Sequence, residues 1–254
     1  MSYTARTLAE HPALRPRFRD FHDRAWPAFL QDTEVNAVFG LIYERFPEFQ
    51  FGLFDGAGRL VAIGNSIPFR WDGRPASLPA RIVDLITGAV RAHQRGRPPT
   101  ALSALAAIVD PRFRGRDLSR RVILTMRRLA ERHRLTALVA PVRPTAKGLY
   151  PLTPMADYVA WRRPDGAPLD PWLRVHWRLG ARVVRIAPRA MAVTATVVEW
   201  EARTGLRFPE SGRYVVPGAF SPVTIDRRRN RGCYVEANVW MRHSVRRTAP
   251  SARR

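Results

Sequence analysis

One stretch of this chain, residues 104–133, constrains the fold more than any other. It opens with an apolar run over 104–109, continues through a basic turn over 110–117, and ends in an amphipathic segment over 118–133. This order predicts a strand, a tight turn and a helix. The first N–H groups of that helix, and the positive end of its dipole, would then lie beside several arginines. The stretch therefore predicts a site for a phosphate or pyrophosphate.

The remaining elements are expected around this unit. The apolar run 135–141 predicts a parallel strand buried on both faces, so that 104–141 forms one right-handed strand–helix–strand crossover. Before it we expect two helical pieces within 7–46, a hairpin over 49–54 and 59–68, and a helix over 82–90. After it come a proline-rich loop over 142–170, a helix over 170–180, strands over 182–186 and 191–200, and short edge strands near 214–217 and 233–240.

The charge of the chain at first indicates a nucleic-acid partner, since the formal net charge is +22 and the pI is near 11.7. Lys147 is the only lysine, so nearly all of the positive charge is arginine, and it is spread along the whole chain. A GC-rich coding bias explains such a skew as easily as selection for a polyanion does. We therefore favour a small anionic ligand, such as a CoA-type cofactor, over a nucleic-acid groove.

Several classes of protein are excluded by what the sequence lacks. No window of eighteen uncharged apolar residues predicts a membrane span, and residues 1–8 do not resemble a secretory signal. The single cysteine, Cys233, cannot form an internal disulfide or a cysteine-rich metal site. We expect a cytoplasmic protein without a metal, built as one domain over 1–245 with a basic, disordered tail over 246–254. We expect no interaction with a membrane, and the sequence does not indicate the oligomeric state.

The order of elements and the residues 109–119 resemble the GNAT superfamily of acyl-CoA-dependent acyltransferases. The pyrophosphate loop of that family begins with Arg or Gln, followed by two residues, Gly, one residue, and Gly or Ala. Arg114 matches the start, Asp117 stands at the first glycine position, and Ser119 stands at the second small position. Residues 175–181 resemble the family's helix that ends in Leu-Gly-aromatic, with Ala181 replacing the aromatic residue. The resemblance implies an α/β (α+β) fold of GNAT type, with a mixed, mostly antiparallel sheet flanked by helices.

The resemblance also implies a donor, acetyl-CoA or another acyl-CoA, and direct transfer of its acyl group to an unidentified small-molecule or peptide amine. A backbone N–H near residue 109 would polarise the thioester carbonyl, the backbone of 108–109 would pair with the pantetheine arm, and the amides of 114–119 would cradle the pyrophosphate. Asp117 adds like-charge repulsion there unless it turns away to cap the helix. The cofactor-binding residues so implied are Ile108, Val109, Arg112, Arg114, Gly115, Arg116, Asp117, Leu118, Ser119 and Arg120, with Arg121 as a further phosphate partner.

Side chains of three residue types are candidates for proton transfer. His176 stands where many family members place a tyrosine, four residues before the glycine, to protonate the leaving thiolate. An imidazole can do the same near neutral pH, and the alternative is a surface helix histidine. Tyr150, and likewise Tyr158, is a rival acid or a packing residue. Glu199, with Glu201, is expected at the end of the 191–200 strand, as a general base or as part of a solvated strand end.

Two other functions fit the sequence. A GNAT-like transferase could take its acyl group from a tRNA or a carrier protein, which would use the positive charge. The fold could also serve as a non-catalytic binding module. No Ser-His-Asp spacing, Walker loop or metal cluster supports a hydrolase, a kinase or a metalloenzyme.

Overall fold

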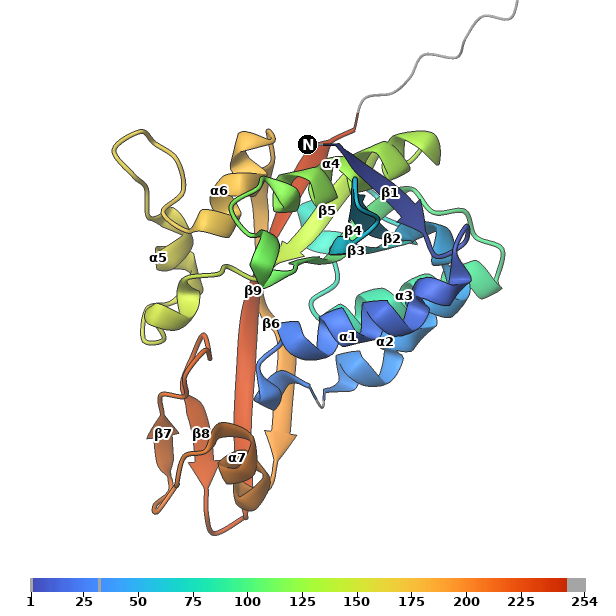
Figure 1. Ribbon diagram of the computed structural model, residues 1–254. Coiled ribbons are helices and arrows are strands. Elements are labelled where there is room, and N and C mark those ends of the chain that lie inside the picture. Colours follow the sequence, from blue (N-terminus) through green and yellow to red (C-terminus); the bar gives the residue numbers. More distant parts are fainter. Residues whose placement is uncertain (1, 32, 246–254) are drawn as a thin grey trace, which may run out of the picture.

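The computed structural model describes residues 2–31 and 33–245, and the tail expected over 246–254 lies outside them. A nine-stranded sheet runs in the order β1-β2-β3-β4-β5-β9-β8-β7, with β6 also paired to β9 (Figure 1). Only β4 and β5 pair in parallel, so the predicted mixed and mostly antiparallel sheet is confirmed. The strands are β1 (Tyr3–Thr7), β2 (Gln50–Asp55), β3 (Leu60–Phe69), β4 (Ala101–Val109), β5 (Ala137–Val142), β6 (Arg182–Ala195), β7 (Gly212–Tyr214), β8 (Val223–Asp226) and β9 (Arg231–Ser244).

Helices cover both faces of the sheet. Figure 1 shows α4 on one side of β2–β5, with α1, α2 and α3 on the other. The main core lies between the sheet and these helices, and α4 buries one apolar face into it, as its amphipathic pattern predicts. The helices are α1 (Arg15–Ala25), α2 (Glu34–Arg45), α3 (Ile82–Gln94), α4 (Leu118–Arg132), α5 (Met155–Ala160), α6 (Pro171–Arg178) and α7 (Val197–Thr204). Within the described residues, no helix is both long and apolar enough to cross a bilayer.

The parallel strands β4 and β5 separate after three residue pairs. They pair only over Ala101–Ser103 and Ala137–Val139. Just beyond that point the register of β4 against β3 shifts, because Asn65 faces Ala106 while Ser66 faces Ala104. A bulge of this kind bends its strand, so it turns β4 away from β5. The result is a gap in the middle of the sheet, between the last six residues of β4 and the end of β5.

The C-terminal part departs from the predicted pattern. The strands expected over 182–186 and 191–200 are one long strand, β6, which ends at Ala195, and the prediction of a strand over 196–200 is wrong. Thr196 begins α7 instead, with a capping box in which its side chain accepts from the N–H of Glu199 while the Glu199 carboxylate accepts from the N–H of Thr196. The strands β6 and β9 form a long hairpin that carries α7, β7 and β8 at its far end (Figure 1).

The sequence pattern also did not predict two further elements, one at the N-terminal end and one in the middle of the chain. The chain opens with an edge strand, β1, which pairs with β2. The loop over 142–170 contains a short helix, α5, which the prolines on either side of it conceal. The hairpin, the strand–turn–helix–strand unit and the helix after Asp170 lie within a few residues of their predicted positions.

Candidate active site

A cavity of about 1170 Å³ occupies the gap between β4 and β5. Its walls come from both strands, from the 110–117 turn and the start of α4, from α6, and from α1 and α2. The cavity therefore reaches both faces of the sheet. Its size suits an extended organic ligand, with room for a second, smaller one.

The open edge of β4 supplies backbone groups to this cavity. Asp110 N donates to Val61 O of β3 at 3.0 Å. Since N–H groups alternate between the two edges of a strand, Val109 directs its N–H and C=O away from β3, toward the gap. Ala107 does the same by the same alternation, whereas the backbone of Ile108 faces β3. Of the two predicted pantetheine contacts, Val109 thus has the free backbone groups.

The turn before α4 leaves the start of that helix uncapped. Gly115 and Asp117 adopt positive φ, 77° and 59°, and so Asp117 occupies the left-handed conformation that a glycine would otherwise take. Its carboxylate makes no hydrogen bond to the helix N–H groups and instead forms an ion pair with Arg120 at 3.1 Å. The N–H groups of Leu118 and Ser119 remain available to an anion. The predicted side-chain cap by Asp117 is wrong, but the carboxylate still turns aside to a partner.

The turn itself is shaped by Asp110. Its carboxylate accepts from Arg112 N at 2.9 Å and pairs with the Arg112 guanidinium at 2.7 Å, which holds the pKa of Asp110 below its usual value. Phe113 is buried beneath the turn, with the guanidinium carbons of Arg59 and Arg116 each 5.2 Å from its ring centroid. The turn is therefore rigid and strongly positive.

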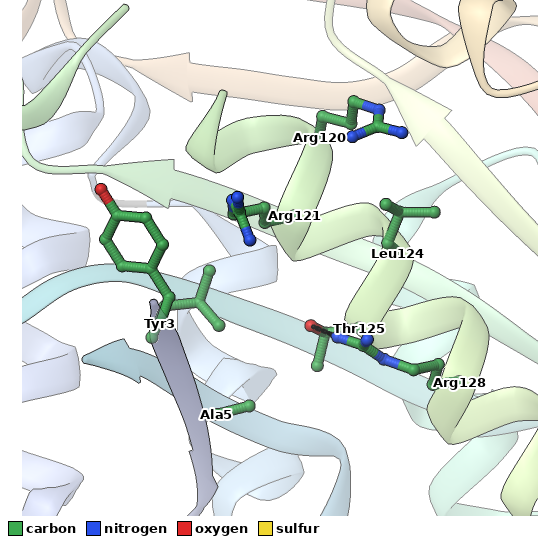
Figure 2. Close-up of a pocket in the computed structure, with 8 residues that line it drawn as sticks. Tyr3, Ala5, Arg120, Arg121, Leu124, Thr125 and Arg128 are labelled. Carbon is green, nitrogen blue, oxygen red and sulfur yellow. Dashed lines mark hydrogen bonds between the residues drawn. The ribbon is translucent and has the colours of Figure 1, made fainter. Parts of the chain in front are cut away.

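Arg121 faces away from this turn. A separate hollow of about 130 Å³ lies between α4 and β1 and is lined by Tyr3, Arg120 and Arg121 among others. Figure 2 shows these side chains. The Arg121 guanidinium lies 5.1 Å from the Tyr3 ring centroid, and Arg128 donates to Thr125 at 3.0 Å in the same hollow. Of the predicted cofactor-binding residues, all but Arg116, Arg120 and Arg121 line the large cavity.

His176 lies at the wall of the large cavity and is 1% exposed, so the alternative of a surface histidine is wrong. Its Nδ1 is 2.9 Å from Nε2 of His243 on β9, and one proton is shared across that bridge. The outer nitrogens, Nε2 of His176 and Nδ1 of His243, have no hydrogen-bond partner among the described residues. Burial lowers the pKa of His176 well below its usual value, and burial lowers the pKa of His243 to about 4. Both imidazoles are therefore neutral at physiological pH.

The position of His176 is fixed by the start of α6. Asp170, 2% exposed, caps the helix by accepting from the N–H groups of Trp172 and Leu173 at 2.8 and 3.0 Å. Its other oxygen accepts from Ala146 N and from the Tyr158 hydroxyl, both at 2.8 Å. One buried carboxylate thus caps α6 and ties it to α5 and to the loop after β5.

The other two candidates lie elsewhere. Tyr150 is 40% exposed and packs against Tyr158 and Trp161, with ring centroids 5.8 and 4.9 Å away. Glu199 is engaged in the capping box of α7, and Glu201 accepts from Arg207 and from Phe208 N. None of Tyr150, Glu199 and Glu201 lines the cavity that holds His176.

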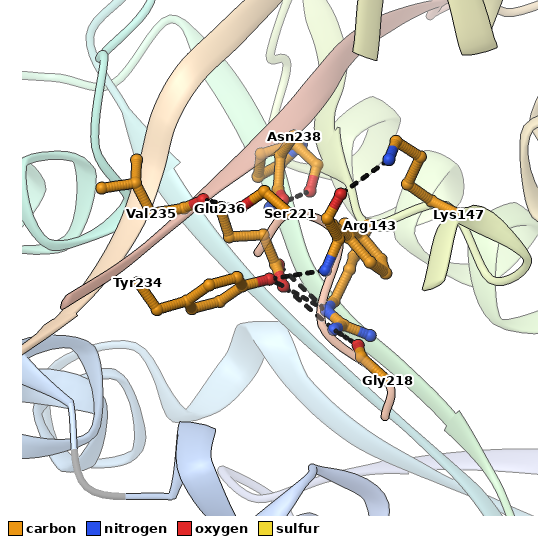
Figure 3. Close-up of polar contacts among 10 residues, drawn as sticks. Arg143, Lys147, Gly218, Ser221, Tyr234, Val235, Glu236 and Asn238 are labelled. Atoms are coloured by element: carbon orange, nitrogen blue, oxygen red, sulfur yellow. Dashed lines mark hydrogen bonds and ion pairs between the residues drawn. The ribbon is translucent and has the colours of Figure 1, made fainter. Parts of the chain in front are cut away.

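The sequence reasoning missed a buried polar network beside the cavity. Arg143, just after β5, donates from Nε and Nη2 to the Glu236 carboxylate, each at 2.9 Å, and from Nη2 to Gly218 O at 3.1 Å (Figure 3). The Tyr234 hydroxyl donates to Glu236 at 2.7 Å. Arg143 and Asn238 line the cavity. A signal was present: Tyr234, Glu236 and Asn238 alternate in an otherwise apolar strand, which puts three polar side chains on one face.

No family model matches the chain. It is 32% identical to the arginine N-acetyltransferase avaD of Aspergillus versicolor, over 96% of this chain and 94% of that protein. The loading GNATL domain of CurA from Lyngbya majuscula superposes with a TM-score of 0.64 at 16% identity, covering 96% of this chain and 98% of that one. The GphF GNAT-like decarboxylase, solved with isobutyryl-CoA, gives a TM-score of 0.61 at 18% identity, covering 97% and 100%. At 16% and 18% identity, each of these superpositions shows that the chain shares the fold of that structure and shows no more than the fold.

Proposed function

The chain belongs to the GNAT superfamily of N-acetyltransferases, and we propose that its acceptor is arginine, acetylated on the α-amine. The observation that carries the acceptor is the 32% identity to an arginine N-acetyltransferase over 96% of the chain. The α-amine is chosen on chemical grounds. A guanidinium stays protonated throughout the physiological pH range, whereas an α-amine has a much lower pKa and therefore supplies a neutral nucleophile far more readily.

The donor, acetyl-CoA, would occupy the gap between β4 and β5. The uncapped N–H groups at the start of α4, with Arg112 and Arg114 beside them, suit its pyrophosphate. The outward backbone of Val109 would pair with the pantetheine arm and direct an N–H at the thioester carbonyl. The positive φ of Gly115 and the open space around it leave that approach unobstructed.

His176 would carry the proton between nucleophile and leaving group. In the tautomer that this role requires, the Nδ1–H of His176 donates to neutral His243, and Nε2, which has no hydrogen-bond partner among the described residues, is the nitrogen without a proton. The amine nitrogen bonds to the thioester carbon, Nε2 takes the proton that the amine loses, and the C–S bond breaks. Nε2 then returns that proton to the sulfur, so the imidazole ends as it began. His243 is a positioning residue in this scheme, comparable to the third member of a catalytic triad.

The test is thiol release from acetyl-CoA in the presence of L-arginine, with NMR of the product to locate the acetyl group. His176→Gln is expected to lower kcat by about 10²–10⁴-fold and to leave the KM for acetyl-CoA within about twofold. Tyr150→Phe and Glu199→Gln are matched controls that should keep the kcat of the parent protein. Unchanged kcat in His176→Gln, or acetylation at the guanidinium, would contradict the scheme.

The donor site is tested separately by isothermal titration with acetyl-CoA. Arg114→Ala is expected to weaken binding about tenfold, since a charge-assisted contact to phosphate is removed. Arg97→Ala, which changes an exposed arginine outside the cavity lining, is the control. No binding at millimolar acetyl-CoA would refute the donor site and favour a tRNA- or carrier-bound donor.

A further inference from the structure

We propose that Arg143 binds the carboxylate of the acceptor, so that the enzyme selects amines that carry a carboxylate on the carbon beside the reacting nitrogen. This inference rests on the proposed function and deepens it. It defines the substrate class as α-amino acids and assigns one side chain to their recognition.

Arg143 is held in place with one edge of its guanidinium unused. Nε and Nη2 are bound by Glu236 and Gly218 O, and the guanidinium carbon lies 4.0 Å from the ring centroid of Phe220. No described residue forms a hydrogen bond with Nη1. The side chain is 22% exposed and lines the cavity. A guanidinium fixed in this way presents its two remaining N–H donors to a ligand at little entropic cost.

The charged side chains around Arg143 also favour an anionic ligand. Lys147 is 1% exposed, and its ammonium donates only to the carbonyl oxygens of Tyr150 and Phe220, at 2.7 and 2.6 Å. Figure 3 shows Lys147 and Arg143 in the same group of polar contacts, in which Glu236 is the carboxylate. Arg143 and Lys147 thus place two positive charges beside the buried carboxylate of Glu236. A substrate carboxylate bound by Arg143 in the cavity would add a second negative charge to this group.

The position of Arg143 agrees with the chemistry. The carboxylate of an α-amino acid is two bonds from the nucleophilic nitrogen, so its binding group must lie in the cavity that holds the proton acceptor. Arg143 and His176 line that same cavity. Arg24 lines it as well, but its side chain is exposed and donates from Nε to Asp20 O. An exposed, screened arginine contributes less to selectivity than one fixed on a buried carboxylate.

The test compares L-arginine with agmatine, which has the same guanidinium and chain but no carboxylate. The enzyme is expected to favour L-arginine by about 100-fold or more in kcat/KM, as a desolvated charge pair requires. The double variant Arg143→Gln/Glu236→Gln removes the guanidinium without leaving a buried, unpaired carboxylate. It should reduce the preference to about threefold or less, with the kcat/KM of agmatine nearly unchanged. Arg143→Lys, which keeps the charge but loses the fixed geometry, should give an intermediate preference.

Arg24→Gln is the matched control and should keep the full preference of the parent enzyme. Equal kcat/KM for arginine and agmatine in the parent enzyme, or an undiminished preference in the double variant, would overturn the inference. If arginine is not acetylated, the acceptor proposed above fails, and the comparison is repeated with lysine against cadaverine and ornithine against putrescine. If no amine reacts, the affinity of CoA-loaded protein for each member of the same pairs is measured by titration. Tighter binding of the amino acid supports the inference, and equal affinity within each pair overturns it.

Discussion

Replacing Asp170 by alanine is expected to destabilise the fold more than any other single change at the start of α6. The carboxylate accepts four hydrogen bonds, from three backbone N–H groups and the Tyr158 hydroxyl, and is 2% exposed. Each such bond has a net value of about 1 kcal/mol, and the loss of a partner also leaves its donor buried. Asp170→Ala should therefore lower the free energy of unfolding by about 4 kcal/mol, of which the lost cap accounts for about 1–2 kcal/mol.

Asp170→Asn distinguishes the contributions of the two carboxylate oxygens of Asp170. The amide oxygen can still accept from Trp172 N and Leu173 N, while the amide nitrogen faces Ala146 N–H and cannot accept from it. The Tyr158 hydroxyl can rotate to accept instead of donate. The expected loss is about 1–2 kcal/mol. Asp165→Ala is the control, because that exposed carboxylate accepts from Ala167 N at 3.1 Å and forms a solvent-exposed ion pair with Arg163 at 3.8 Å, so its loss should cost less than about 1 kcal/mol.

The assay is urea unfolding followed by far-UV circular dichroism, with the slope checked for constancy between variants. From most to least stable, the expected order is the parent protein, Asp165→Ala, Asp170→Asn and Asp170→Ala. A loss below about 1 kcal/mol in Asp170→Ala would refute the claim that this carboxylate ties α6 to its neighbours.

Two further outcomes are expected. Gly64→Ala should lower the free energy of unfolding by about 1–3 kcal/mol in the same urea assay, because a Cβ at Gly64 would overlap the buried ring of Phe51. Stability should also fall as the pH drops from about 6.5 to about 4. In that range His243 is protonated in the unfolded chain, whereas burial keeps it neutral in the folded chain until the pH reaches its folded-state pKa of about 4. Urea midpoints across that range should show a shallower dependence in His243→Asn, and an equal slope would contradict this origin.

The parts of the fold that the sequence predicts are those with strong local signals. The apolar run before Asp110, the basic turn and the amphipathic pattern of α4 each depend on residues close together in the chain. The error at 196–200 arose because Thr and Val favour strands, whereas the Thr196–Glu199 capping box favours a helix start. That signal was local too, and attention to it would have placed Glu199 on α7.

The candidate site was predictable only in part, because its partners are distant in sequence. His176 was identified from its place in a helix, but His243 lies 67 residues further along and nothing near it indicates the pairing. Arg143 and Glu236 are separated by 93 residues. Contacts of this kind are set by the register of β9 between β5 and β6, which no local pattern specifies.

The place of β9 in the sheet has a consequence for synthesis of the protein. The last described strand pairs with β5, β6 and β8, so the middle of the sheet is completed by residues that are synthesised after its other described strands. Until they leave the ribosome, β5 has an unpaired edge, which is open to wrong pairing with other chains. His243 and Glu236 arrive with the same strand. The nascent chain can therefore form the turn proposed to bind phosphate early, but it acquires the complete proposed active site only after β9 has been synthesised.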